Sequence, residues 1–95
     1  MKRTVKTRAI SAALLRKGFE ARPSHHTFYY LLVDGRPEKI HTIISHGVDE
    51  YGPDLLSRMR RQLRFPTMEA FLNFVECNLG YDEYVRLLRE AGEIG

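Results

Sequence analysis

The sequence predicts an α+β fold of two layers, in which helices pack on a sheet. Three observations lead to this class. Segments with the alternating pattern of strands follow a first helical segment, and further helical segments come after them. A chain of 95 residues also has the size of one domain and can bury only a thin core. We therefore expect a single domain over residues 1–95.

Four helices are predicted, one before the strands and three after them. The first spans Thr7–Lys17, where apolar residues recur at helical spacing. The second begins near Pro53, because proline suits the first turn of a helix. Pro66 opens a third helix, and a fourth ends at Gly92. The second helix is expected to bury one stripe and to expose the opposite one, which consists of Ser57, Arg60, Arg61 and Arg64.

Three antiparallel strands are predicted over residues 19–22, 26–33 and 39–45. Aromatic and β-branched residues fill the middle segment, and the Asp-Gly pair after it is a strong hairpin signal. We expect the loop to continue through Arg36 and Pro37. Alternation divides the middle strand into two faces, with Phe28, Tyr30 and Leu32 on one and Tyr29, Leu31 and Val33 on the other. The face that contains Tyr30 is expected to pack in the core.

The last two predicted helices form a hairpin, residues 66–92, whose apolar stripes are too hydrophobic to face water. The first two helices are expected to cover one face of the three-stranded sheet. Tyr29, Leu31 and Ile43 would then lie uncovered on the far face. We expect the hairpin to cover that face within the same chain.

Basic side chains are concentrated in two parts of the chain. Residues 1–22 carry seven Lys and Arg against one Glu, and residues 51–65 carry four Arg against one Asp, whereas the chain from Pro66 onward is acidic. Two basic clusters favour a polyanionic partner, because affinity for phosphates rises with the number of Lys and Arg contacts. The alternative is an ordinary solvated helix surface. The side chains expected to contact RNA phosphates are Lys6, Arg8, Lys17, Arg60, Arg61 and Arg64.

Several classes of protein do not fit the sequence. No apolar run approaches the roughly 20 residues that a membrane-spanning helix needs, and the basic start lacks the apolar stretch of a signal peptide. The single cysteine, Cys77, cannot form an internal disulfide and is expected to be a half-buried structural thiol. These features predict a cytoplasmic protein without a membrane partner.

Four histidines lie between residues 25 and 46. His25 and His26 stand at the junction of the first two strands, where an exposed imidazole can act as an acid or base for proton transfer. Strand alternation turns their rings to opposite sides of the sheet, so at most one faces a given ligand. His46 can approach His26 only if the two strands pair in the register of the hairpin. The alternative is a pair of surface histidines at a strand start.

The histidines do not form a recognised metal-ligand set. No His-x₃-His pair lies on a predicted helix, and no nearby Cys or carboxylate completes such a set. We expect neither a metal nor another cofactor.

Several short segments resemble the HicA toxin family. Residues 12–19 and 24–29 are similar to its opening, where a helix ends in a Lys-Gly-Phe-like step and a Gly-Ser-His segment enters the second strand. Residues 42–47 and 55–63 are similar to its second half, where a strand ends in a His-Gly step before the last helix. The resemblance covers residues 7–64.

The resemblance implies an α-β-β-β-α fold like the double-stranded RNA-binding domain, with two extra helices over residues 65–95. It also implies a metal-independent endoribonuclease that acts on mRNA and is neutralised by a HicB-type antitoxin. The family's catalytic histidine corresponds to His26, with His25 in place of the serine, or to His25, with Pro23 in place of the glycine. A non-catalytic module of the same fold, which binds RNA or a protein, is the alternative.

Overall fold

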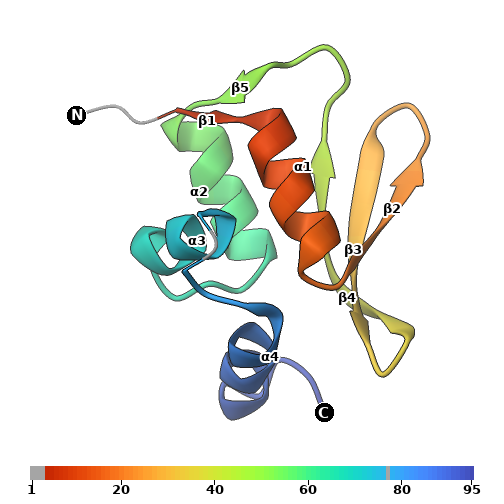
Figure 1. Ribbon diagram of the computed structural model, residues 1–95, viewed down its shortest axis with the longest axis vertical. Coiled ribbons are helices and arrows are strands. Elements are labelled where there is room, and N and C mark those ends of the chain that lie inside the picture. Colours follow the sequence, from red (N-terminus) through yellow and green to blue (C-terminus); the bar gives the residue numbers. More distant parts are fainter. Residues whose placement is uncertain (1–3, 77) are drawn as a thin grey trace.

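The computed structural model describes residues 4–76 and 78–95, in which five strands and four helices form an α+β fold (Figure 1). The elements are β1 (Val5–Lys6), α1 (Thr7–Arg16), β2 (Phe19–Pro23), β3 (Thr27–Val33), β4 (Arg36–Ile44), β5 (Glu50–Tyr51), α2 (Pro53–Gln62), α3 (Met68–Val75) and α4 (Tyr81–Glu90). The predicted class is confirmed, and so is the order of one helix, three strands and three helices. The short strands β1 and β5, which pair with each other, were not predicted. Cys77, expected to be a structural thiol, lies outside the described residues.

The sheet has the antiparallel order β2-β3-β4, and a tight turn joins its last two strands. Asp34 and Gly35 both have positive φ, at 55° and 77°, as a two-residue hairpin turn requires. The chain therefore re-enters the sheet at once, and β4 begins at Arg36. The expectation of a longer loop through Pro37 is wrong, because Pro37 already pairs with Leu32. A proline is tolerated there because β4 is an edge strand.

The face of β3 that packs in the core is the one that contains Tyr29 and Leu31. Their side chains are 6% and 0% exposed, and the Tyr29 hydroxyl hydrogen-bonds to the Ser11 hydroxyl of α1 at 2.7 Å. Phe28 and Tyr30 lie on the opposite, half-exposed face, so the predicted assignment of the two faces is wrong. Both faces of this strand are apolar, and alternation alone cannot decide which of them meets the helices.

Helices α1 and α2 lie together on the core face of the sheet, as predicted (Figure 1). α1 buries Ile10 and Leu14, and α2 buries Leu56 and Met59. None of the helices in the described part of the chain is both long and apolar enough to cross a membrane.

The hairpin of α3 and α4 packs within the chain, but beside α1 and α2 and not on the far face of the sheet. Phe19, at the start of β2, lies 6.2 Å from the ring of Phe74 and 6.1 Å from that of Tyr84. The predicted cover of the far face is wrong because Tyr29 and Leu31 already face α1 and α2. One hydrophobic cluster thus contains residues of the sheet and of all four helices.

A close approach at Gly18 lets α4 dock on the sheet. Gly18 has φ of 87°, and a Cβ atom at this position would lie only 2.4 Å from the ring of Tyr81. The Tyr81 hydroxyl donates a hydrogen bond of 2.7 Å to the carbonyl of Leu32. The glycine after α1 therefore does more than end the helix, because it also makes room for the hairpin.

Candidate functional site

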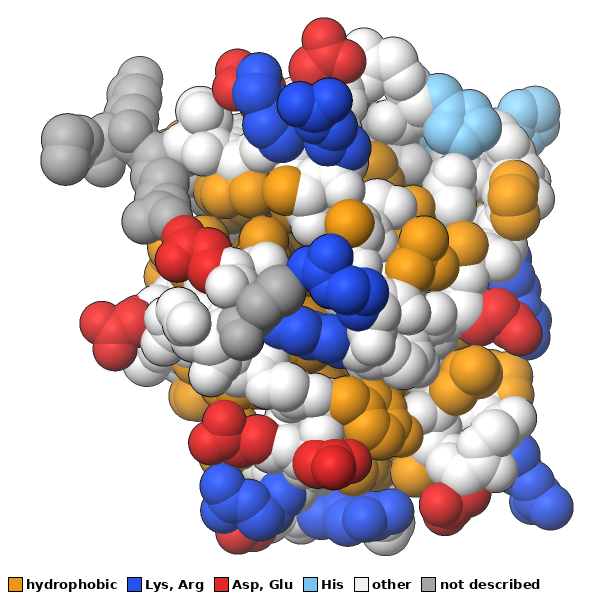
Figure 2. All heavy atoms as spheres, viewed as in Figure 1, with side chains coloured by type: hydrophobic (Ala, Val, Ile, Leu, Met, Phe, Trp, Pro, Cys, Tyr) orange, Lys and Arg blue, Asp and Glu red, His pale blue; other side chains and the backbone are white. Residues whose placement is uncertain are grey.

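The end of the sheet where β3 begins and β4 ends brings two histidines together. Thr27 pairs with Ile44, so His26 and His46 lie just beyond this last pair. Their ring centres are 6.4 Å apart, and the ring planes meet at 73°. Oγ1 of Thr27 lies 3.1 Å from Nε2 of His46. The approach expected for this register is confirmed, and Figure 2 shows histidine side chains gathered at one corner of the molecule.

Two turns hold these histidines beside the strand ends. After β2 the chain bends through residues 24–26, and the amide of Ser24 donates a hydrogen bond of 2.8 Å to the carbonyl of His26. On the other strand, His46 precedes Gly47, whose φ of 80° favours glycine. Both imidazoles are therefore exposed, although the ordered sheet fixes the backbone beneath them.

A surface hollow of about 230 Å³ lies beside this corner, between the end of β4 and the side of α2. Tyr51 forms part of its wall. The Tyr51 hydroxyl accepts a hydrogen bond of 3.1 Å from the amide of Ser45 and lies 3.4 Å from the carbonyl of Ile43. The hollow is lined by His26, Ile43, Ser45, Tyr51, Leu55, Arg58, Met59 and Gln62.

Arg58 is the cation in this lining, and it was not among the predicted site residues. Its side chain is exposed, and no ion pair to it is found within residues 4–76 and 78–95. Leu55, Arg58 and Gln62 are spaced as neighbours on one side of a helix. The sequence therefore contains a signal for this face, but only the packing of α2 shows that it borders the histidines.

His25 is exposed and does not belong to the lining of the hollow. Of the two adjacent histidines, the structure thus places His26 against the hollow. This arrangement agrees with the expectation that at most one of them faces a given ligand.

Lys17, expected to contact RNA, is buried and only 7% exposed. Its ammonium group donates hydrogen bonds to the carbonyls of Phe74 and Leu79, the latter at 2.9 Å, and lies 4.7 Å from the centre of the Phe74 ring. This expectation is corrected, because the cation connects the end of α1 to the hairpin and does not face solvent.

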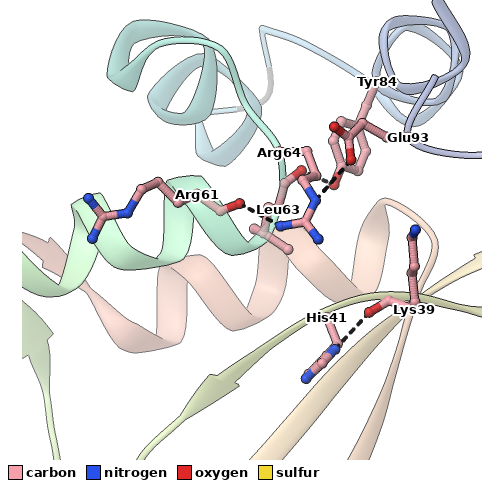
Figure 3. A network of polar contacts seen from close by, with 7 residues as sticks. All are labelled: Lys39, His41, Arg61, Leu63, Arg64, Tyr84 and Glu93. Atoms are coloured by element: carbon pink, nitrogen blue, oxygen red, sulfur yellow. Dashed lines mark hydrogen bonds and ion pairs between the residues drawn. The ribbon is translucent and has the colours of Figure 1, made fainter. Parts of the chain in front are cut away.

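The arginines after the middle of α2 do not share one exposed face. The helix ends at Gln62, and Arg64 takes φ of 67°, which turns the chain out of the helical path. Arg64 then pairs with Glu93 at 3.0 Å and donates to the carbonyl of Arg61. Figure 3 shows the Arg61 side chain extending away from Arg64, whose guanidinium lies between the Arg61 carbonyl and Glu93. Arg60 in turn donates to the carbonyl of Phe65 at 2.8 Å.

The same region contains a buried tyrosine that fixes the end of α2. The Tyr84 hydroxyl donates a hydrogen bond of 2.7 Å to the carbonyl of Leu63 (Figure 3). Burial raises the pKa of Tyr84 far above its ordinary value, against a smaller lowering by the charge of Arg64. The phenol therefore stays neutral and serves as a structural donor.

Lys6 and Arg8 line a separate hollow of about 330 Å³ at the start of α1, together with Thr7 and Asp49. Lys6 pairs with Glu50 at 3.2 Å, and both side chains are exposed. In the view of Figure 2, Lys and Arg side chains stand in separate groups, most of them with acidic side chains nearby. Lys and Arg side chains thus do not form one continuous patch on this face.

The open face of the sheet presents a row of stacked rings. Tyr30 stacks on His41 with ring centres 5.0 Å apart and on Phe28 at 6.3 Å. The guanidinium of Arg22 lies 5.0 Å from the centre of the Tyr30 ring, and Nδ1 of His41 is 2.8 Å from the carbonyl oxygen of Lys39 (Figure 3). His41 is therefore part of this surface, and not of the corner that contains His26.

Among the described residues, no group of three or more His, Cys, Asp or Glu side chains comes together in a way that could hold a metal ion. The two histidines and Arg58 at the sheet end are exposed groups that can take part in acid–base chemistry and phosphate binding. No protein-family model, no curated protein and no solved structure matches the chain.

Proposed function

We propose that the chain is a HicA-like endoribonuclease that cleaves mRNA without a metal ion, with His26 as its general base. The observation that carries this proposal is the position of His26 at the rim of a hollow that also contains Arg58. The imidazole is accessible, and the guanidinium beside it suits a phosphate. The resemblance of residues 7–64 to the HicA family supports the same activity.

The reaction follows from the functional groups present. His26 takes the proton of a ribose 2′-hydroxyl, and the oxygen attacks the adjacent phosphorus. The bond from phosphorus to the 5′-oxygen breaks and this oxygen takes up a proton, which leaves a 2′,3′-cyclic phosphate and a 5′-hydroxyl end. Arg58 neutralises the negative charge on the phosphate oxygens. DNA lacks the attacking hydroxyl and is not cleaved.

The order helix, three antiparallel strands, helix over residues 7–64 supports a fold similar to the double-stranded RNA-binding domain. On this proposal the protein acts in the cytoplasm, where mRNA is found, and a HicB-type antitoxin neutralises it. Residues 65–95 form an extension that stabilises the core from the side of α1 and α2.

The proposal is tested by cleavage of an end-labelled RNA in a buffer that contains a metal chelator. His26→Ala is expected to reduce the rate by a factor on the order of 10² to 10⁴, the usual contribution of an acid–base group. His25→Ala is expected to leave the rate within a few-fold, because His25 neither lines the hollow nor belongs to the pair of facing rings formed by His26 and His46. The same oligonucleotide with a 2′-deoxyribose at the cleaved position should remain intact. Undiminished cleavage by the His25/His26 double alanine variant would refute the assignment.

A second candidate function is RNA binding without cleavage. The stacked rings of Phe28, Tyr30 and His41 favour it, because exposed aromatic side chains on a sheet can stack with unpaired bases. Tight binding of RNA together with no cleavage by the wild-type protein would favour this candidate over the nuclease.

A further inference from the structure

His46 occupies a position from which it can serve the same phosphodiester group as His26. The two imidazoles come from different strand ends, and their ring centres are 6.4 Å apart. A hydrogen bond extends roughly 2.7–3.2 Å from each ring nitrogen, so both rings can reach one phosphate between or above them. Cleavage of RNA needs two proton transfers, one from the attacking oxygen and one to the leaving oxygen. Two histidines at this distance can provide both.

Thr27 contacts one ring nitrogen of His46 and leaves the other available for substrate. In the imidazolium form both ring nitrogens are donors, and Nε2–H can donate to Oγ1 of Thr27, 3.1 Å away. Nδ1–H is then left to donate to a leaving oxygen. After the proton has been transferred, the tautomer of the neutral ring that carries its proton on Nε2 retains the same hydrogen bond. One contact with Thr27 thus fixes the ring in both protonation states.

His46 is not itself in the lining of the hollow, but its ring lies beside that of His26, which is. Arg58 lies in the adjoining hollow and attracts the phosphate to this corner. Gly47 accounts for the turn that keeps His46 at the strand end, with φ of 80°. The nearest carboxylates after His46 in the sequence are Asp49 and Glu50. Asp49 lines the separate hollow at the start of α1, and Glu50 pairs with Lys6.

We propose that His46 is the general acid of the reaction, which rests on the proposed ribonuclease function. His26 takes the 2′-hydroxyl proton while the bond from this oxygen to phosphorus forms. The bond from phosphorus to the 5′-oxygen breaks, and this oxygen takes the Nδ1 proton of His46. The step leaves His26 protonated and His46 neutral, and proton exchange with water restores both.

A pair of substrates separates the acid from the base. One is an RNA dinucleotide, whose 5′-alkoxide must be protonated to leave. The other is a nucleoside 3′-(p-nitrophenyl phosphate), whose phenolate leaves without a proton. His46→Ala is expected to slow cleavage of the dinucleotide on the order of 10² to 10⁴-fold and to change cleavage of the activated ester by only a few-fold. His26→Ala is expected to slow both reactions.

Two further variants keep the test independent of folding. Thr27→Val retains a β-branched residue in the strand but removes the hydroxyl, and it should slow the dinucleotide reaction roughly threefold to tenfold with little effect on the ester. Arg86→Gln removes an exposed cation on α4 that pairs with Glu83 and Glu90, away from the sheet end, and should leave both rates unchanged.

The possible failures can be told apart. If the wild-type protein cleaves neither substrate, the proposed function fails and the role of His46 fails with it. If the wild-type protein cleaves both, the role of His46 is overturned by either of two results. These are an unchanged dinucleotide rate in His46→Ala and an equal loss on both substrates.

Discussion

Two groups of basic side chains differ in what they contact. At the sheet end, His26, His46 and Arg58 are exposed. Where the helices meet the hairpin, Lys17 and Arg64 instead contact carbonyl and carboxylate groups of their own chain. The same kinds of residue thus stabilise the fold in one region and are available for a ligand in the other. Net charge cannot distinguish the two groups, because it is the same whether or not a side chain already contacts a carbonyl or carboxylate of its own chain.

The largest effect on stability is expected from Lys17→Met, which keeps much of the side-chain volume but removes the buried ammonium. The carbonyls of Phe74 and Leu79 lose this donor. A buried acceptor without a partner costs about 1–3 kcal/mol, so the free energy of unfolding should fall by about that amount. Urea denaturation followed by circular dichroism measures the change.

The matched control is Lys6→Met, which removes an exposed lysine paired with Glu50. Its effect should stay below about 1 kcal/mol, since exposed ion pairs contribute little. If both variants were equally stable, Lys17 would not be an anchor of the hairpin, and the contrast between the two groups would be lost.

A smaller effect is expected on RNA binding when Arg58 or Arg64 is replaced singly. In a His26→Ala background, which prevents cleavage, Arg58→Gln should weaken binding and flatten the dependence of log K on log salt by roughly 0.7 for one lost phosphate contact. Arg64→Gln should leave the slope unchanged, because Glu93 and the carbonyl of Arg61 already hold its guanidinium. Fluorescence anisotropy at several salt concentrations provides both slopes. A larger change for Arg64 than for Arg58 would reverse the comparison.

Local patterns in the sequence predicted the elements well. The Asp34-Gly35 pair marked the hairpin turn, and helical spacing marked all four helices. The sequence also indicated that His46 can approach His26 if the two strands pair in the register of the hairpin, and the strands do so. These features depend on neighbours in the chain, which is why the sequence alone was sufficient.

Features that depend on long-range packing were not predictable in the same way. Tyr29 and Tyr30 are adjacent and chemically identical, and only the docking of α1 makes Tyr29 the buried one. Arg58 borders His26 because α2 packs against β4. Lys17 is an intermediate case: its helical spacing placed it in line with Ile10 and Leu14, which predicts burial, whereas its charge suggested a phosphate contact.

Whether RNA binds at the sheet end is tested most directly by nuclear magnetic resonance. Amide signals of the ¹⁵N-labelled protein are recorded while a 2′-O-methyl RNA, which cannot be cleaved, is added. The largest shifts are expected at residues 26–28, at residues 45–47 and around Arg58, with small shifts at Lys17 and across residues 66–92. Shifts concentrated in residues 66–92, or no shifts at the sheet end at saturating RNA, would contradict the assignment of this corner as the active site.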